Sequence, residues 1–364
     1  MTARTAHTGT PRAAARGPRA RGLAAAAAAA LAAAIGLAGT SPALAQAPSG
    51  KATLDVVKGR GQLVCGVIGT FFGFSAPDSQ GRMRGIDADA CRAIAAATLG
   101  DGEKVRFTNL TAQQRFPALQ SGEVDVLYAI ATWTLTRDSK LGMTFASINY
   151  YDGAGFMVRR SSNVKSAREL DGASICIQSG GTGEAVVADW ARRNKVQYKP
   201  VLIADAEENR RAFLSGRCDA YQSDGVVLSV FMRNQGPKAS EFAILPDVLS
   251  NEPLGGAVRK GDDRWFDIVR WTHYALVAAE TLGITQENVD AMTKSESPEV
   301  RRLLGVEGDI GPSLGLDAKW AYNAIKAVGN YGEVWTRNIG PTGLQRGANR
   351  SWKDGGLHYA PPIR

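Results

Sequence analysis

The sequence has few of the residues and motifs with which most enzymes work. Its 364 residues include only three histidines, His7, His273 and His358, and their number and spacing do not predict a shared metal site. No Gly-Lys-Ser/Thr phosphate-binding loop is present, and no Cys-x-x-Cys pair that would indicate a redox or zinc role. The sequence therefore predicts neither a metal centre nor a bound nucleotide, and we expect no cofactor.

Long hydrophobic runs are equally scarce. One apolar stretch, residues 23–38, approaches the ~20 residues that span a bilayer, so a polytopic membrane protein is excluded. A content of 44% hydrophobic and 21% charged residues excludes a disordered chain, because disordered chains are poor in apolar residues. At roughly 150 residues per domain, the length corresponds to about two domains.

The first 45 residues have the pattern of a bacterial secretory signal peptide. Residues 1–22 carry five arginines and no acidic residue, the apolar run follows, and the small-x-small triplet Ala43-Leu44-Ala45 comes after it. The pattern predicts cleavage after Ala45 and export to the periplasm, and the alternative is a single membrane anchor. No Arg-Arg pair occurs in this segment, so the twin-arginine route has no support.

The net charge changes when this segment is removed. The whole chain has 43 basic and 35 acidic residues, a formal charge of +8 and a pI of about 9.4, which alone would suggest a nucleic-acid or membrane-surface partner. Without the five arginines of the signal peptide, the remaining 319 residues carry 38 basic and 35 acidic residues, a charge of +3. We therefore predict no nucleic-acid partner.

All four cysteines, Cys65, Cys91, Cys176 and Cys218, lie in the exported part. An even number of cysteines in an oxidising compartment favours two disulfide bonds. Four cysteines allow three connectivities, and their spacing alone leaves all three open.

Predicted strands and helices alternate along the chain. Strands are expected at residues 62–67, 105–109, 124–128, 155–158, 173–177, 197–202, 218–222 and 254–258. Helices are expected at residues 87–99, 113–120, 167–170, 183–194, 206–214, 225–234 and 263–282. This alternation predicts an α/β fold with mainly parallel sheets covered by helices. Near copies at residues 118–125 and 212–219, each with a helix end, a glycine turn and a strand start, indicate two similar Rossmann-like lobes.

Polar residues follow the matching strands of the two lobes: Thr132 and Arg137 in the first, and Asp224 in the second. Ligands of open α/β sheets bind at the carboxyl ends of the strands, so two facing lobes would place these residues around one cleft. A guanidinium binds a carboxylate through two parallel hydrogen bonds, and an aspartate accepts from an ammonium, which suits a zwitterion. Amides of the Gly180-Gly181-Thr182 turn before a helix would also favour a carboxylate. The alternatives are a surface arginine, a capping aspartate and a plain tight turn.

Several segments resemble the periplasmic amino-acid-binding proteins of bacterial ABC transporters, solute-binding protein family 3, and most of all the general or polar L-amino-acid-binding proteins. The resemblance covers residues 50–364. The segments that carry it are GFSAPDSQGRMRGIDADACRAIAAATLGD from Gly73, RFPALQSGEVDVL from Arg115, TWTLTRD from Thr132, INYYDGAGFMV from Ile148, GRCDAYQSD from Gly216, GGAVRKGDDRWFDIVRWTHYAL from Gly255, RRLLGVEGDIG from Arg301, NYGEVW from Asn330 and GGLHYAPPIR from Gly355.

The resemblance implies the type 2 periplasmic binding fold, with two lobes joined by a two-crossover hinge. Lobe one would combine residues 51–152 and 254–364, and lobe two would be residues 153–253. In that fold the cysteines pair locally, Cys65 with Cys91 and Cys176 with Cys218.

The resemblance also implies roles for the cleft residues. Arg137 matches the arginine that binds the ligand α-carboxylate, assisted by Thr132 and by Thr182 of the Gly180-Gly181-Thr182 turn. Asp224 matches the acidic residue that holds the α-ammonium.

Two further positions have alternative interpretations. Phe71, or else Phe72, matches an aromatic wall against the ligand side chain, and either could instead belong to the core. Arg115 matches a position that approaches the distal carboxylate of acidic ligands, and it could instead be a surface arginine. Two hydroxyl positions of the family are missing here, because residues 129–131 are Ala-Ile-Ala and Gly181 stands where a threonine is common.

The implied function is that of a monomeric periplasmic protein that binds an L-amino acid between its lobes and delivers it to an inner-membrane ABC permease. One alternative is an enzyme on the same fold that resembles cyclohexadienyl dehydratase, with Glu184 as the general acid. Another is a binding protein for a different small solute, which the missing hydroxyls motivate. The sequence leaves the identity of the amino acid open.

Overall fold

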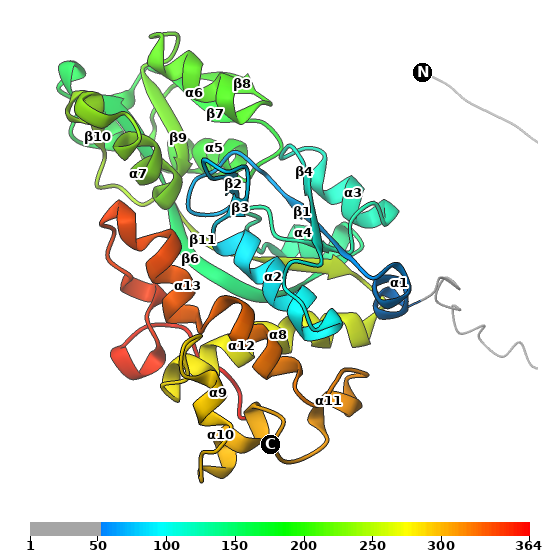
Figure 1. The fold of residues 1–364 in the computed structure, drawn as a ribbon. Coiled ribbons are helices and arrows are strands. Elements are labelled where there is room, and N and C mark those ends of the chain that lie inside the picture. Colours follow the sequence, from blue (N-terminus) through cyan, green and yellow to red (C-terminus); the bar gives the residue numbers. More distant parts are fainter. Residues whose placement is uncertain (1–51) are drawn as a thin grey trace, which may run out of the picture. The chain divides into compact units, whose positions relative to one another are not determined.

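The computed structural model describes residues 52–364, so the predicted signal peptide and its cleavage site lie outside the described residues. A nine-stranded mixed sheet runs through the described part in the order β4-β1-β5-β11-β6-β9-β7-β8, and β10 pairs with β6 (Figure 1). Its strands are β1 (Leu63–Val67), β4 (Val105–Asn109), β5 (Val126–Leu127), β6 (Met143–Arg159), β7 (Ser174–Gln178), β8 (Lys199–Ile203), β9 (Ala220–Asp224), β10 (Phe242–Ile244) and β11 (Ser250–Arg259). A separate two-stranded sheet pairs β2 (Ala76–Pro77) with β3 (Met83–Arg84).

Helices pack on these strands and follow them along the chain. Their bounds are α1 (Thr53–Arg60), α2 (Ile86–Leu99), α3 (Arg115–Ser121), α4 (Leu135–Lys140), α5 (Gly183–Asn194), α6 (Ala206–Leu214), α7 (Gly225–Arg233), α8 (Asp263–Thr281), α9 (Val289–Met292), α10 (Pro298–Leu303), α11 (Ile310–Ser313), α12 (Trp320–Val328) and α13 (Tyr331–Asn338). The α/β class predicted from the sequence is confirmed. Among the described helices, none is long and apolar enough to cross a membrane.

Two long strands, β6 and β11, connect the two ends of the sheet. They run antiparallel, with Asp152 of β6 opposite Glu252 of β11. On one side of them β4, β1 and β5 pair in parallel, and on the other side β9, β7 and β8 do the same. The sheet is thus parallel at both ends, as the strand–helix alternation predicted, and antiparallel in the middle.

The buried side chains form three clusters in the described part. The largest draws mainly on residues 54–150 and 254–363, and the other two on residues 154–249. The two smaller clusters lie on opposite faces of the β6-β9-β7-β8 end, because successive strand residues point to opposite faces. Ile175 and Ile177 belong to one cluster, and Cys176 between them belongs to the other.

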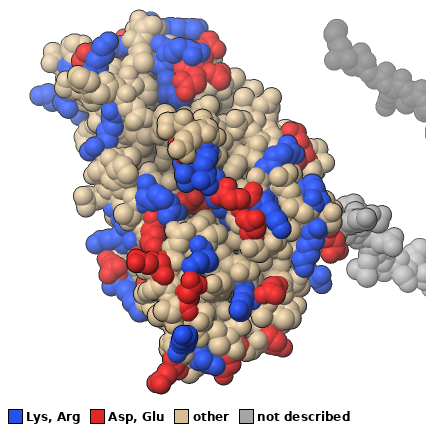
Figure 2. All heavy atoms as spheres, viewed as in Figure 1, with Lys and Arg blue, Asp and Glu red and all other residues tan. Residues whose placement is uncertain are grey.

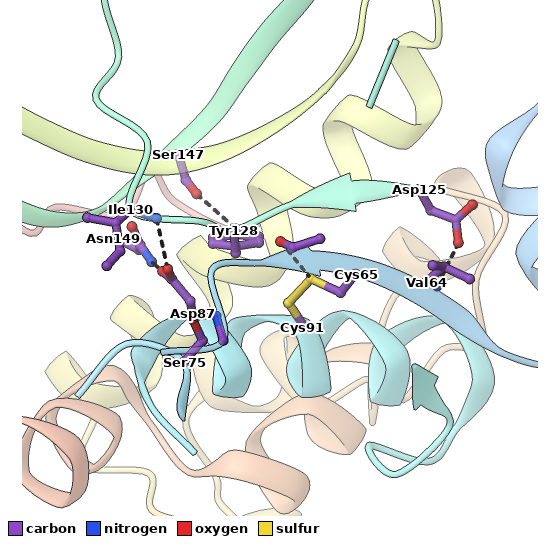
Figure 3. The surroundings of a disulfide bond; sticks show 12 residues. Val64, Cys65, Ser75, Asp87, Cys91, Asp125, Tyr128, Ile130, Ser147 and Asn149 are labelled. Carbon is purple, nitrogen blue, oxygen red and sulfur yellow. Dashed lines mark hydrogen bonds between the residues drawn. A yellow bond between two sulfur atoms is a disulfide. The ribbon is translucent and has the colours of Figure 1, made fainter. Parts of the chain in front are cut away.

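Both disulfide bonds are local. Cys65 in β1 is bonded to Cys91 in α2, with Cα atoms 6.2 Å apart (Figure 3). Cys176 in β7 is bonded to Cys218, which lies two residues before β9, with Cα atoms 5.6 Å apart. This is the pairing that the resemblance implied.

The C-terminal segment, residues 300–364, packs onto the rest of the described chain. Helix α12 lies against α2 and α8, and α13 lies against α8 (Figure 1). The hydroxyl of Tyr331 donates to the carbonyl of Asn149 in β6 at 2.8 Å, and the side chain of Asn349 exchanges two hydrogen bonds with the main chain of Tyr151. These contacts fasten the segment to the middle of β6, next to Asp152.

Charged side chains are mixed over the molecular face that Figure 2 shows. Lysines and arginines alternate with aspartates and glutamates there, and no continuous basic area is visible on that face. This view agrees with the near balance of charge in residues 46–364.

Candidate functional site

A cavity of about 60 Å³ lies where loops from the two ends of the sheet meet. Its lining includes six residues that the sequence predicted, Phe71, Arg115, Thr132, Gly181, Thr182 and Asp224. It also includes residues that the sequence did not point to, among them Ile130, Gln178, Gln222 and Ser223. The other three predicted residues, Arg137, Gly180 and Phe72, lie outside this lining.

One buried arginine, Arg115, lines the cavity, and a second, Arg137, lies behind it. Arg115, at the start of α3, donates from Nη1 to the carbonyls of Ala129 and Ile130 at 2.7 and 3.0 Å, and its buried Nε has no hydrogen-bond partner within residues 52–364. Arg137, in α4, donates to the Thr132 carbonyl at 2.9 Å. The two guanidinium carbons lie 4.8 and 4.9 Å from the centre of the Phe116 ring.

The positive charges of this pair are costly to bury. Burial, followed by the charge of Arg137, lowers the pKa of Arg115 to about 9. Burial also lowers the pKa of Arg137. An anion bound between the two would favour their charged forms, because an opposite charge offsets the lost hydration. This side of the cavity is therefore suited to a carboxylate.

Asp224, at the end of β9, supplies negative charge to the same cavity. Burial raises its pKa well above the usual value, and the charges of Asp152 and Glu252 raise it further. The pKa of Asp152 rises to about 7, mainly through burial. A cation beside Asp224 would stabilise its ionised form, so this side of the cavity is suited to an ammonium group.

Glu252 of β11 bridges the two ends of the sheet, and sequence reasoning missed it. The residue is 2% exposed, and its carboxylate accepts hydrogen bonds from the hydroxyls of Thr132 at 2.6 Å and Thr182 at 3.1 Å. The hydroxyl of Ser250 donates to its other oxygen at 2.5 Å. Both threonine hydroxyls predicted to assist the ligand carboxylate thus donate to Glu252 here. A charged residue at the predicted crossover was the signal that could have identified it.

The glycines of the 180–183 turn allow close approach to the opposite loop. Gly180 has φ of +81°, and a Cβ at this position would lie 2.7 Å from Cγ of Gln113. A Cβ on Gly183 would lie 2.1 Å from Oε1 of Gln222. Nearby, Nε2 of Gln113 donates to Oγ of Ser179 at 3.1 Å. The turn therefore meets the loop after β4 with no room for larger side chains.

The main chain at residues 129–131 contacts two buried charged side chains, Arg115 and Asp87. Ile130 has φ of +49°, an uncommon conformation for a β-branched residue. Its N–H donates to Asp87 at 3.0 Å, and Asn149 donates to the same carboxylate at 2.8 Å (Figure 3). Burial raises the pKa of Asp87 to about 6. The strained backbone turns two carbonyls toward Arg115 and so fixes its position.

Phe71 and Phe72 differ in position. Phe71 is 8% exposed and lines the cavity, whereas Phe72 is 58% exposed. The Arg210 guanidinium carbon lies 4.8 Å from the centre of the Phe71 ring. Of the two phenylalanines, Phe71 is the one placed to contact a ligand.

The carboxylate considered for catalysis lies away from the cavity. Glu184 accepts from the Gly180 amide at 3.3 Å and is not part of the cavity lining.

Residues 311–315 match the Gly-x-Ser-x-Gly spacing of hydrolases, but Ser313 is exposed in the short helix α11 and donates to the Asp309 carbonyl. In residues 52–364 no group of three or more acidic, histidine or cysteine side chains is placed to hold a metal.

Comparison with known proteins gives a family. The family model of the bacterial extracellular solute-binding proteins, family 3, matches residues 63–288. The chain belongs to this family. It therefore shares the family's type 2 periplasmic binding fold, and the cavity described above lies between the two ends of its mixed sheet.

Relatives of nearly the same length strengthen this assignment. The glutamate/glutamine/aspartate/asparagine-binding protein BztA of Rhodobacter capsulatus is 51% identical over 326 residues, which cover 88% of this chain and 96% of the relative. The general L-amino acid-binding periplasmic protein AapJ of Rhizobium johnstonii is 51% identical over 318 residues, covering 86% and 93%. The similarity thus extends into the C-terminal segment beyond the family match.

Solved structures give the same fold. A periplasmic binding protein of an ABC transporter from Brucella ovis, with glutathione bound, has a TM-score of 0.83 and 50% identity, covering 86% of this chain and 99% of that one. An ancestral amino acid-binding protein, described as a precursor of cyclohexadienyl dehydratase, has a TM-score of 0.54 and 27% identity, covering 64% and 95%. This structure, whose description connects it to the enzyme alternative, is a remote neighbour and is itself described as an amino acid-binding protein.

Proposed function

We propose that this protein is exported to the periplasm, binds an L-amino acid as a zwitterion, and delivers it to an inner-membrane ABC permease. The observation that carries the proposal is a cavity lined by both the buried guanidinium of Arg115 and the buried carboxylate of Asp224. Free amino acids carry the two complementary charges on one carbon atom. We expect cleavage after Ala45, which N-terminal sequencing of the exported protein would test.

The proposed roles follow from the positions of the charges. Asp224 holds the α-ammonium. Arg137, with its guanidinium turned from the Thr132 carbonyl toward the ligand, and the amides of the turn at residues 180–182 hold the α-carboxylate, since both threonine hydroxyls already donate to Glu252. Arg115 and Phe71 line the cavity and meet the ligand side chain.

Ligand binding is coupled to closure of two lobes, residues 51–152 with 254–364 and residues 153–253. The hinge lies in β6 and β11, where Asp152 and Glu252 are opposite each other. The contacts of Thr132 with Glu252 and of Gln113 with Ser179 join the two lobes and hold the closed arrangement. A ligand that touches both lobes adds to these contacts and shifts the population toward the closed state.

The ligand range that we propose includes acidic amino acids and their amides. Arg115 lines the cavity, and its guanidinium can donate to a side-chain carboxylate or amide oxygen. BztA is named as a binding protein for these four amino acids, and AapJ is named as a general L-amino acid-binding protein. Glutathione, bound to the Brucella protein, belongs in the same set of test ligands.

Isothermal titration calorimetry on protein freed of ligand by unfolding and refolding tests the proposal. We expect one-to-one binding of at least one of the twenty L-amino acids, and loss of that binding in Arg137→Met and Asp224→Asn. Lys140→Met, an exposed position on the same helix as Arg137, is the matched control and should bind as the wild type does. Heat from none of the twenty amino acids, with a correctly folded protein, would refute amino-acid binding.

A further inference from the structure

A second cavity of about 170 Å³ lies on the other side of Phe71. Phe71 and Val227 line both cavities, so these two side chains form the wall between them. The rest of the second cavity is lined by side chains from α6, α7 and the loop after β1, among them Thr70, Phe72, Arg210 and Gln235. The larger empty space thus begins where the side chain of a bound amino acid would point.

Arg210 is the cationic group in the lining of this second cavity, and Glu207 is the anionic one. Arg210 lies in α6 and is only 7% exposed. Its ion pair is with Glu207, whose side chain is 49% exposed. A buried guanidinium with an exposed partner can exchange that partner for a ligand carboxylate at small cost, because Glu207 can turn into solvent. Arginine is also the residue best suited to bind a carboxylate through two hydrogen bonds.

Phe71 lies between the amino-acid cavity and Arg210. Its ring separates the amino-acid cavity from the second one, and the guanidinium of Arg210 lies 4.8 Å from the ring centre. A ligand chain that leaves the first cavity past Phe71 therefore arrives at Arg210. Neutral amide donors and acceptors, including Gln235, line the same space and suit a peptide bond.

We infer that the site is a two-compartment site, which also binds amino acids extended at the side chain by an amide-linked unit that ends in a carboxylate. This inference rests on the proposed function, because the α-ammonium and α-carboxylate still bind in the first cavity. The amide link passes Phe71, and the terminal carboxylate pairs with Arg210 in place of Glu207. A free amino acid fills the first compartment and leaves the second one to water.

The experiment compares three ligands by calorimetry on refolded full-length mature protein. These are L-glutamate, γ-L-glutamylglycine, and γ-L-glutamylglycinamide, which has no terminal carboxylate. The quantity of interest is the ratio of the dipeptide Kd to the glutamate Kd. In Arg210→Gln we expect this ratio to rise at least tenfold, while the dipeptide amide shows no such change. Arg211→Gln, an exposed arginine on the same helix, is the matched control and should leave the ratio within about twofold.

A second variant should change the affinity for the dipeptide in the opposite direction. Glu207→Gln removes the group that competes for Arg210, so it should tighten dipeptide binding several-fold. A purely structural role of the ion pair predicts weaker binding of every ligand instead.

Three results would overturn the inference. The first is binding of glutamate without binding of the dipeptide, and the second is an equal loss of both in Arg210→Gln. The third is a dipeptide amide that responds to Arg210→Gln as strongly as the acid does. If neither glutamate nor any other amino acid binds to the wild type, the proposed function itself fails, which is a distinct outcome.

Discussion

His273 of α8 is held as a neutral imidazole beneath the C-terminal segment. Its ring centre lies 5.7 Å from that of His358 and 5.9 Å from that of Tyr331. Burial lowers the pKa of His273 from 6.5 to about 4. Burial, followed by the charges of His273 and Arg346, also lowers the pKa of His358. Acid should therefore weaken the attachment of this segment to β6.

The size of the effect follows from linkage. Between pH 6.5 and pH 4 the unfolded chain binds a proton at His273 that the folded chain does not, so the free energy of unfolding falls as the pH falls. With a pKa of about 4 in the folded state and 6.5 in the unfolded state, the loss at pH 5 is about 2 kcal/mol. It approaches about 3 kcal/mol below pH 4.

Urea unfolding of the wild type and His273→Phe, at pH 7.5 and pH 5.0, measures this loss. Phenylalanine keeps an aromatic ring in the contact with Tyr331 and removes the titrating group. Groups distant from His273 titrate alike in both proteins and cancel in the difference. In the variant His358 no longer faces the charge of His273, so acid costs it less there, which increases the difference between the two proteins. We expect the wild type to lose about 2 kcal/mol more than the variant between the two pH values. An equal loss in both proteins would refute the reasoning.

Three further predictions concern the cleft and the fold. Because burial raises the pKa of Asp224, binding of an ammonium should release a proton from this residue. The buffer takes up that proton, so the apparent binding enthalpy at neutral pH should differ between phosphate and Tris buffers, and identical enthalpies would contradict the prediction. Thr132→Val removes the hydroxyl that donates to Glu252 across the lobes, a bond to a charged group worth about 1.5–3 kcal/mol. The Kd of the ligand should therefore rise about tenfold to a hundredfold, and an unchanged Kd would argue against closure through this contact. Replacing Cys65 and Cys91 together by serine opens a loop with a sequence separation of 26 residues and should lower the free energy of unfolding in urea by about 3 kcal/mol, whereas a loss below about 1 kcal/mol would not fit.

Local signals in the sequence were sufficient for many elements. The predicted helix at residues 206–214 has the bounds of α6, where Asp205 caps the first turn by accepting from the Glu208 amide at 2.7 Å. The predicted helix at residues 183–194 has the bounds of α5, and the predicted strand at residues 105–109 has those of β4. Capping residues, apolar spacing and glycine turns are short-range features, and for this reason a single sequence reveals them.

The middle of the sheet was predicted less well. The strand expected at residues 155–158 is part of β6, which begins at Met143, and the strand expected at residues 254–258 begins at Ser250. Both extensions depend on pairing between segments about a hundred residues apart, which local propensity does not encode. Glu252 was missed for the same reason, because its partners Thr132 and Thr182 come from distant parts of the chain.

The sequence indicated which residues belong to the site better than it indicated how they are arranged. Asp224 and Arg115 line the cavity, but Arg137 lies behind it, against the Thr132 carbonyl and the Phe116 ring. The spacing of Thr132 and Arg137 places both after one strand without fixing which guanidinium faces the cavity. That choice depends on packing around Phe116, which the sequence does not display.

A crystal structure with the tightest-binding L-amino acid tests the central claim most directly. The account predicts the α-ammonium within hydrogen-bond distance of the Asp224 carboxylate, and the α-carboxylate in contact with the guanidinium of Arg137 or Arg115. It also predicts Phe71 beside the ligand side chain. A ligand bound outside this cavity, or one with its carboxylate beside Asp224, would contradict it.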